Sequence, residues 1–285
     1  MPQPNEHREI ELPAGTIRYR DSGEGRPVVF VHGFLVDGRL WDGVAESLTA
    51  RGGYRCIQPD WPLGSHRVAL KPDADLSPYG LAQLFADFFE ALDLRDAIVA
   101  GNDSGGALSQ VFVSRHPERV GALALTNCDA FEEFPPGPFK PLPSLVKVPG
   151  AMELLALPLR VPAVARAAYK PFTKRPLPAD LVASWAEPPL HDGGVKRDTR
   201  KFLAGMNKRY TLEAAERLRS FEKPTVIAWA PEDRTFKLKE GRRLAETIPG
   251  AKFVQVPDAA TFVPFDQPQA VAEAIAGLDG AGASS

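Results

Sequence analysis

The 285-residue sequence predicts an α/β fold in which helices flank a mainly parallel central sheet. Short apolar segments recur along most of the chain and alternate with stretches whose apolar residues have helical spacing. Parallel strands need crossover connections, and a helix after each strand supplies them. Residues 27–34 are apolar almost throughout, as is typical of a strand buried on both faces.

The predicted elements follow one another in a regular order over the first 130 residues. Residues 8–21 alternate polar and apolar side chains around a Pro-Ala-Gly break, which predicts a β-hairpin. A helix is expected at 40–53, where Gly52 and Gly53 end the pattern. The later segments alternate in type: strand 54–61, helix 76–94, strand 97–103, helix 107–120 and strand 122–129.

The regular alternation stops after Asp129 and resumes near residue 224. Residues 131–150 are rich in proline, and two further stretches, 154–172 and 181–206, resemble short broken helices. We therefore expect an inserted helical cap at 131–215. The expected core comprises 1–130 and 216–279, with strands at 224–233 and 251–258, helices at 239–250 and 267–278, and a frayed tail at 280–285.

Composition excludes several classes of partner. The formal net charge is −2 and basic residues do not cluster, so no nucleic acid partner is expected. The N-terminal residues lack the apolar stretch of a secretion signal and no segment reaches membrane-spanning length, which predicts a cytoplasmic protein with no membrane partner. Cys56 and Cys128 are expected as buried free thiols. The sequence does not indicate an oligomeric state.

The most informative motif is VAGNDSGGALSQ at residues 99–110. An apolar strand ends in a turn of small residues and a helix follows at once, which is the form of the nucleophile elbow G-x-S-x-G. The position of the attacking serine in that motif is held here by Asp103. The sequence therefore predicts carboxylate chemistry at this turn. The alternative structural role for Asp103 is an Asx turn or a helix N-cap.

Several motifs in this order resemble the α/β-hydrolase superfamily, and the aspartate in the elbow resembles its haloalkane dehalogenase and epoxide hydrolase branch. They are HGF at 32–34, GNDSGG at 101–106, RHPERV at 115–120, PEDRTF at 231–236 and FVPFDQP at 262–268. The resemblance covers nearly the whole chain except the cap and implies the α/β-hydrolase fold. It also implies a small-molecule substrate held between sheet and cap.

The resemblance implies a role for several residues. Asp103 would attack an electrophilic carbon, and the backbone N–H groups of Ser104 and Phe34 would form the oxyanion hole. Asp233 would be the catalytic acid. Asp129 and Glu133 offer a second location for that acid, because some dehalogenases draw it from there. A solvated loop carboxylate paired with Arg234 is the structural alternative for Asp233, and Ser104 itself is an alternative attacking group.

The sequence departs from the family at the histidine that should follow the last strand. Thr261 stands before Phe262, where the family pattern has histidine. Threonine cannot accept a proton near neutral pH, and loss of a positioned base costs roughly 10²–10⁴ in rate. An ordinary two-step hydrolysis should therefore stall at the covalent ester. His66, in a loop after a strand, is the candidate substitute acid or base. No histidine pair has metal-ligand spacing and no phosphate loop is present, so neither a metal nor a cofactor is expected.

Three functions are consistent with this pattern. The first is hydrolysis of a small apolar molecule, as in epoxide hydrolases or dehalogenases, with Asp103 as nucleophile. The dehalogenases resembled here hold the halide with a tryptophan after the nucleophile, where this chain has Ser104, whereas epoxide opening needs cap tyrosines such as Tyr169 and Tyr210. The second is cofactor-free lyase, cyclase or isomerase chemistry with Asp103 as general base. The third is a non-enzymatic ligand-binding relic of the fold.

Overall fold

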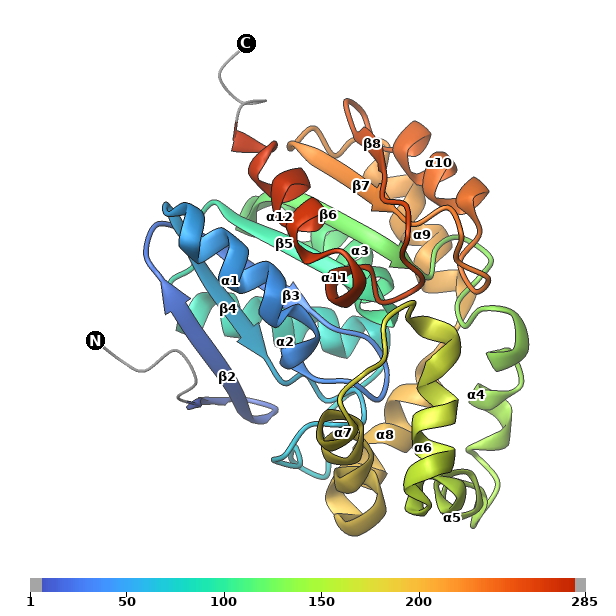
Figure 1. Cartoon of the computed structure of the whole chain (residues 1–285). Coiled ribbons are helices and arrows are strands. Elements are labelled where there is room, and N and C mark those ends of the chain that lie inside the picture. The colour runs from blue at the N-terminus through green and yellow to red at the C-terminus, as the bar shows by residue number, and fades with distance from the viewer. Residues whose placement is uncertain (1–6, 280–285) are drawn as a thin grey trace.

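The computed structural model describes residues 7–279, in which one sheet has the strand order β1-β2-β4-β3-β5-β6-β7-β8 (Figure 1). The neighbouring strands from β4 onwards pair in parallel, whereas β2 pairs antiparallel with both β1 and β4. The expected hairpin and the mainly parallel sheet are both confirmed. The strands are β1 (Arg8–Leu12), β2 (Gly15–Gly23), β3 (Arg26–Val31), β4 (Tyr54–Pro59), β5 (Ala97–Asp103), β6 (Val120–Cys128), β7 (Thr225–Trp229) and β8 (Lys252–Gln255).

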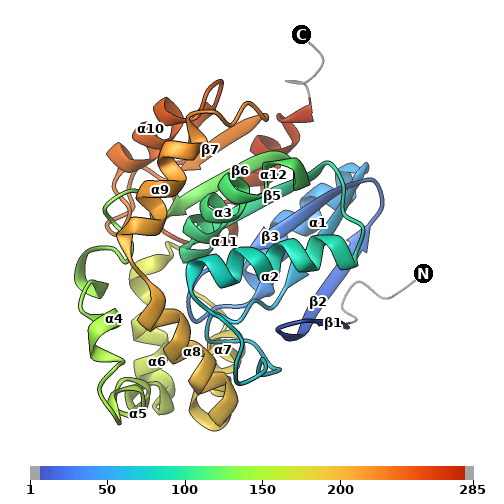
Figure 2. The ribbon, with the colours of Figure 1, turned by 180° about the vertical axis from the view of Figure 1, so that it is seen from behind.

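Helices cover both faces of the sheet because its central strands are apolar on both sides. In β3, Val28 and Phe30 pack into one hydrophobic cluster, and Val29 and Val31 pack into the other. Figures 1 and 2 show the two faces in turn. One face carries α1 (Asp42–Arg51), α11 (Val263–Asp266) and α12 (Pro268–Ala276), and the other carries α2 (Pro78–Ala91), α3 (Ser104–Arg115), α9 (Lys208–Leu218) and α10 (Leu238–Thr247).

Local sequence signals set the helix ends. The Ser77 hydroxyl accepts a hydrogen bond from the N–H of Gly80, and Pro78 occupies the first turn of α2, where its missing N–H is not needed. The helix α1 stops at Gly52, whose φ of 81° is readily adopted only by glycine.

The chain between β6 and α9 forms a group of helices beyond the carboxyl ends of the strands, of which only the last two are long (Figure 1). We expected this insertion to extend to residue 215, but α9 packs against α3 beside the sheet. The group consists of η3 (Gly137–Phe139), α4 (Leu142–Leu145), α5 (Ala151–Ala156), η4 (Leu157–Arg160), α6 (Pro162–Tyr169), η5 (Lys170–Phe172), α7 (Ala179–His191) and α8 (Gly193–Gly205).

Three further expectations can be placed on this structure. Cys56 and Cys128 are buried free thiols, as expected. Within residues 7–279, no helix has both the length and the apolar character needed to cross a bilayer. The expected frayed tail at 280–285 lies outside the described residues.

Gly105 sets how closely α3 approaches β3. A Cβ on Gly105 would lie 2.2 Å from the carbonyl oxygen of His32 and 2.4 Å from that of Val31. Because both contacts are backbone atoms, the Gly105→Ala variant must shift the helix, and overpacking of this kind costs about 1–3 kcal/mol. We expect urea unfolding to report a loss in this range.

The matched control is Gly193→Ala, since a Cβ at that exposed position meets nothing within 4 Å. This control should leave the unfolding midpoint unchanged or raise it slightly. Equal midpoints for the two variants would contradict the close approach of α3 to β3.

Candidate active site

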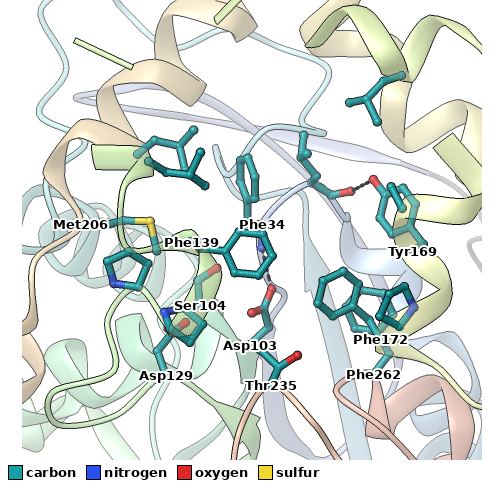
Figure 3. Close-up of a pocket in the computed structure, with 18 residues that line it drawn as sticks. Phe34, Asp103, Ser104, Asp129, Phe139, Tyr169, Phe172, Met206, Thr235 and Phe262 are labelled. Atoms are coloured by element: carbon teal, nitrogen blue, oxygen red, sulfur yellow. Dashed lines mark hydrogen bonds between the residues drawn. The ribbon is translucent and has the colours of Figure 1, made fainter. Parts of the chain in front are cut away.

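Asp103 ends β5 in a backbone conformation that residues other than glycine seldom adopt. Its φ is 55° and its ψ is −138°, which costs on the order of 1–3 kcal/mol. Its side chain makes no capping hydrogen bond to α3, so the alternative role as a helix cap does not apply. The carboxylate instead accepts a hydrogen bond from the backbone N–H of Phe34, with Oδ2 3.1 Å from the nitrogen (Figure 3). The turn therefore displays the carboxylate away from the helix.

The loop that carries Phe34 approaches Asp103 closely because residue 33 is glycine. A Cβ on Gly33 would lie 2.0 Å from Oδ2 of Asp103. His32 holds this loop in place: its Nδ1 lies 2.9 Å from the carbonyl oxygen of Gly33, and its Nε2 accepts a hydrogen bond from the N–H of Trp61 at 2.8 Å. Burial lowers the pKa of His32 to about 4, so the ring is neutral and positions the loop.

Asp103 faces a cavity of about 340 Å³ whose walls are mainly apolar (Figure 3). Elements of the sheet and of the inserted helices contribute to it together. None of its lining side chains carries an N–H group. The lining residues are Phe34, Leu35, Asp103, Ser104, Asp129, Pro135, Pro136, Phe139, Leu142, Leu159, Ala168, Tyr169, Pro171, Phe172, Leu203, Met206, Thr235 and Phe262.

The apolar surroundings make Asp103 a weaker acid than a solvated aspartate. Burial raises the pKa of Asp103 to about 7, and the charge of Asp233 contributes in the same direction. The N–H groups of Phe34 and Ser104 stabilise the ionised form and oppose this rise. The carboxylate is thus hydrogen-bonded to the Phe34 amide, and the Ser104 amide, the second one expected for the oxyanion hole, also stabilises its charge. An acyl oxygen of an ester on Asp103 would inherit the same donors.

Thr261, where the sequence pattern led us to expect a histidine, forms a hydrogen bond to the expected acid, Asp233. Its hydroxyl donates to the Asp233 carboxylate, with Oγ1 3.0 Å from Oδ1 and 3.1 Å from Oδ2. Asp233 also accepts hydrogen bonds from the Asn127 amide at 2.9 Å and from the N–H of Thr235 at 2.8 Å. Burial raises the pKa of Asp233, and these donors partly offset the rise. The carboxylate is therefore a buried, hydrogen-bonded group, and not a solvated partner of Arg234.

Two buried asparagines organise this edge of the sheet, and the sequence reasoning did not assign them a role. The amide nitrogen of Asn102 lies within hydrogen-bond distance of the carbonyl of Thr261 at 2.7 Å and the hydroxyl of Thr126 at 2.9 Å. Asn127 links the ends of β6 and β7, because its Oδ1 accepts a hydrogen bond from the N–H of Ala230 at 2.7 Å. The detectable signal is an amide side chain at the end of an otherwise apolar strand.

His66 does not line the cavity around Asp103, contrary to the expectation that it is a substitute acid or base. Its Nε2 lies 3.4 Å from Oδ2 of Asp198 in α8, and both side chains are buried. Asp198 also accepts a hydrogen bond from the N–H of Leu70 at 2.7 Å. None of the five histidines, all of which fall within residues 7–279, lines the cavity around Asp103.

The two tyrosines expected in the insertion are not brought together. Tyr169 lines the cavity, but its hydroxyl donates to the carbonyl of Leu35 at 2.6 Å. Tyr210 belongs to α9 and packs edge-on against Tyr79, and Arg209 donates to its hydroxyl. A pair of tyrosines aimed at one substrate oxygen is therefore not part of this cavity.

Ser104 and the two alternative acids, Asp129 and Glu133, differ in their surroundings. The Ser104 hydroxyl is buried in the cavity wall and has no hydrogen-bond partner within the described residues. Asp129 also lines the cavity, whereas Glu133 forms an ion pair with Lys140 at 2.9 Å outside it. Of the two alternative positions for an acid, the structure brings only Asp129 to the site.

The pKa of Asp103 links the charge of this site to stability. Because folding raises that pKa to about 7, the stability that Asp103 contributes is fully present below about pH 4 and is lost as pH rises through 7. Asp103→Asn should therefore raise the free energy of unfolding, relative to the unaltered protein, by more at pH 8 than at pH 5. The difference between the two pH values should be on the order of 2 kcal/mol. Thermal unfolding at both pH values measures this difference.

Asp93→Asn is the control, because Asp93 shares a positive φ of 45° but is exposed. If Asp103→Asn changed the free energy of unfolding equally at pH 5 and pH 8, burial of the ionised Asp103 carboxylate would not be destabilising, which would contradict the raised pKa.

The chain has sequence relatives in Mycobacterium tuberculosis. The chain is 32% identical to an uncharacterized protein of Mycobacterium tuberculosis over 146 residues, which cover 51% of this chain and 41% of that protein. This chain thus matches about two fifths of that relative's length. It is also 27% identical to haloalkane dehalogenase 2 of Mycobacterium tuberculosis over 293 aligned positions, covering 95% of this chain and 94% of the relative.

Solved structures and a family model give the same result for the fold. A haloalkane dehalogenase from Bradyrhizobium elkani superimposes with a TM-score of 0.78 at 18% identity, covering 98% of this chain and 99% of that one. The family model described as the alpha/beta hydrolase fold matches residues 26–268. The chain belongs to the α/β-hydrolase fold family.

Proposed function

We propose that the protein is a hydrolase in which the Asp103 carboxylate attacks a small, apolar, electrophilic substrate and forms an ester. The observation that supports this most strongly is the setting of Asp103: a carboxylate on a strained turn, held by the Phe34 N–H at 3.1 Å, facing an apolar cavity of about 340 Å³. A nucleophile in such a cavity has few hydration waters to lose before attack. The similarity to haloalkane dehalogenases is consistent with this role.

The character of the cavity favours a leaving oxygen over a halide. The resembled dehalogenases hold a halide with a tryptophan after the nucleophile, and this chain has Ser104 there. The lining side chains offer no N–H donor for a halide. Epoxides and other strained cyclic ethers of modest size release no halide, so they fit a cavity without halide-binding groups better than haloalkanes do. Tyr169 is not free to assist, because its hydroxyl is already bonded to Leu35.

A second candidate function follows from the pKa of Asp103. A carboxyl with a pKa of about 7 in an apolar cavity is a competent general base, and a lyase or isomerase of this kind needs no imidazole. Such an enzyme would exchange a substrate C–H proton with solvent and would form no ester. The two candidates are therefore distinguished by whether a covalent adduct exists.

Acid quenching during a single turnover tests the proposal. Enzyme in excess over a short-chain terminal epoxide should show a mass increase equal to that of the epoxide, and peptide mapping should locate it on Asp103. Asp103→Asn should give no adduct and a rate lower by at least roughly 10³, since the attacking group is lost.

Asp93→Asn, an exposed control, should behave like the unaltered protein. Substrate turnover without any adduct at Asp103, or an adduct that persists in Asp103→Asn, would overturn the proposal. Solvent exchange into an acidic C–H compound that depends on Asp103 would favour the general-base alternative, and ligand binding without either reaction would favour a relic.

A further inference from the structure

Asp129 is a second carboxyl group beside Asp103, and the topology of the sheet brings the two together. β5 and β6 are parallel neighbours in which Asp103 lies opposite Cys128, so Asp129 follows at the same edge. Asp129 is 1% exposed and forms part of the cavity wall close to Asp103 (Figure 3). Two carboxyl groups from adjacent strands therefore border one apolar cavity.

The Asp129 carboxyl differs from those of Asp103 and Asp233 in accepting no hydrogen bond from another residue. Neither Oδ1 nor Oδ2 meets a donor among residues 7–279, although the backbone carbonyl of the same residue accepts a hydrogen bond from Gln110 at 2.9 Å. By contrast, Asp233 meets three donor groups. A buried polar group without partners costs about 1–3 kcal/mol. A purely structural residue at this position would gain from being apolar.

The burial of Asp129 away from donors determines which of the two carboxyl groups, Asp103 or Asp129, carries the proton. Burial, with the charge of Asp103 as the second cause, raises the pKa of Asp129 well above its ordinary value. The amides of Phe34 and Ser104 stabilise the negative charge of Asp103, whereas only the residue's own backbone N–H does so for Asp129. One proton shared by the pair is therefore held by Asp129 while Asp103 is ionised.

We propose that Asp129 is the general acid and base of this site, protonating the leaving oxygen of a strained cyclic ether and then activating the water that cleaves the ester. This inference rests on the proposed attack by Asp103. In this role Asp129 would carry protons at the wall of the same cavity, which no histidine lines. Retaining glycosidases divide the same tasks between two carboxyl groups.

The first half-reaction consumes the shared proton. An oxygen of the Asp103 carboxylate forms a bond to a ring carbon, and the electron pair of the breaking C–O bond passes to the ring oxygen. That oxygen takes the proton from Asp129. The products are a hydroxyalkyl ester on Asp103 and an ionised Asp129, so charge and protons balance.

The second half-reaction returns the proton. Water attacks the ester carbonyl carbon and gives one proton to Asp129, while the amides of Phe34 and Ser104 hold the oxyanion. Collapse breaks the bond to the alkoxide, which takes this proton and leaves as the second hydroxyl of a diol. The remaining proton of the water stays on the new Asp103 carboxyl and passes to Asp129. The pair again holds one proton.

Asp129→Asn separates the two half-reactions when the leaving group is varied. Bromide leaves without a proton, so a primary alkyl bromide should alkylate this variant and release about one equivalent of bromide per enzyme. In the unaltered protein Asp129 then releases its proton to solvent and acts as the base, so the ester of the variant should hydrolyse roughly 10²–10⁴ more slowly. An epoxide should react slowly in the first step as well. Glu133→Gln, which alters a carboxyl outside the cavity, is the matched control.

A rescue variant separates loss of proton transfer from loss of structure. Thr261 donates to Asp233, so a histidine at 261 would find an orienting carboxylate, although overpacking costs about 1–3 kcal/mol. The double variant Asp129→Asn, Thr261→His should hydrolyse the accumulated ester at least tenfold faster than Asp129→Asn alone. Stoichiometric bromide release itself reports the folded, reactive fraction.

The outcomes distinguish this inference from the function on which it rests. An Asp103 ester that Asp129→Asn forms and hydrolyses at the unaltered rate would overturn the role of Asp129 and leave Asp103 as nucleophile. Absence of any ester in the unaltered protein under acid quench would overturn the proposed function. Slow hydrolysis in Asp129→Asn without rescue by histidine would contradict a proton-transfer role.

Discussion

The close approach of three backbone segments around Asp103 is the constraint on which the site depends. The helix α3 reaches β3 only because Gly105 has no side chain, and the loop after β3 reaches the carboxylate only because Gly33 has none. Between them the chain turns at Asp103 with a φ of 55°. The result is a carboxylate fixed on the N–H of Phe34 at the rim of an apolar cavity. The strain of the turn is maintained by the packing around it.

Three carboxyl groups lie at the ends of β5, β6 and β7 or just beyond them, and their surroundings give them different properties. Asp103 has backbone amides and stays ionisable near neutral pH. Asp233 is held by the side chains of Asn127 and Thr261. Asp129 meets no donor from another residue, and burial raises its pKa well above the ordinary value, which favours its protonated form. All three residues are aspartates on one sheet edge, so residue type does not distinguish them. Their hydrogen bonding and burial support the distinct roles that we propose.

Much of the fold was predictable because its signals are local. Alternating strands and helices, the proline at 78 and the glycine at 52 identify elements that depend on neighbouring residues in the sequence. The elbow at Asp103 was predictable for the same reason. The boundary of the insertion was not, because α9 looks like its other helices and is distinguished only by its packing on α3.

The remaining site features depend on partners that are remote in sequence. His66 meets Asp198, which is 132 residues away, and Asn102 meets Thr261, which is 159 residues away. No local pattern encodes such pairs. The lack of a partner at Asp129 is still harder to foresee, since it depends on every residue that folds around the carboxyl group. Sequence reasoning could name Asp129 as an alternative acid, but it could not tell that the group would be buried without donors.

Single-turnover hydrolysis in water enriched in ¹⁸O tests the central claim most directly. With enzyme in excess over an epoxide, the account predicts that the heavy oxygen enters the Asp103 carboxyl group and that the first diol formed carries only ordinary oxygen. Heavy oxygen in that first diol, with Asp103 unlabelled, would mean that water attacks the substrate itself. Such a result would contradict an aspartate nucleophile in this site.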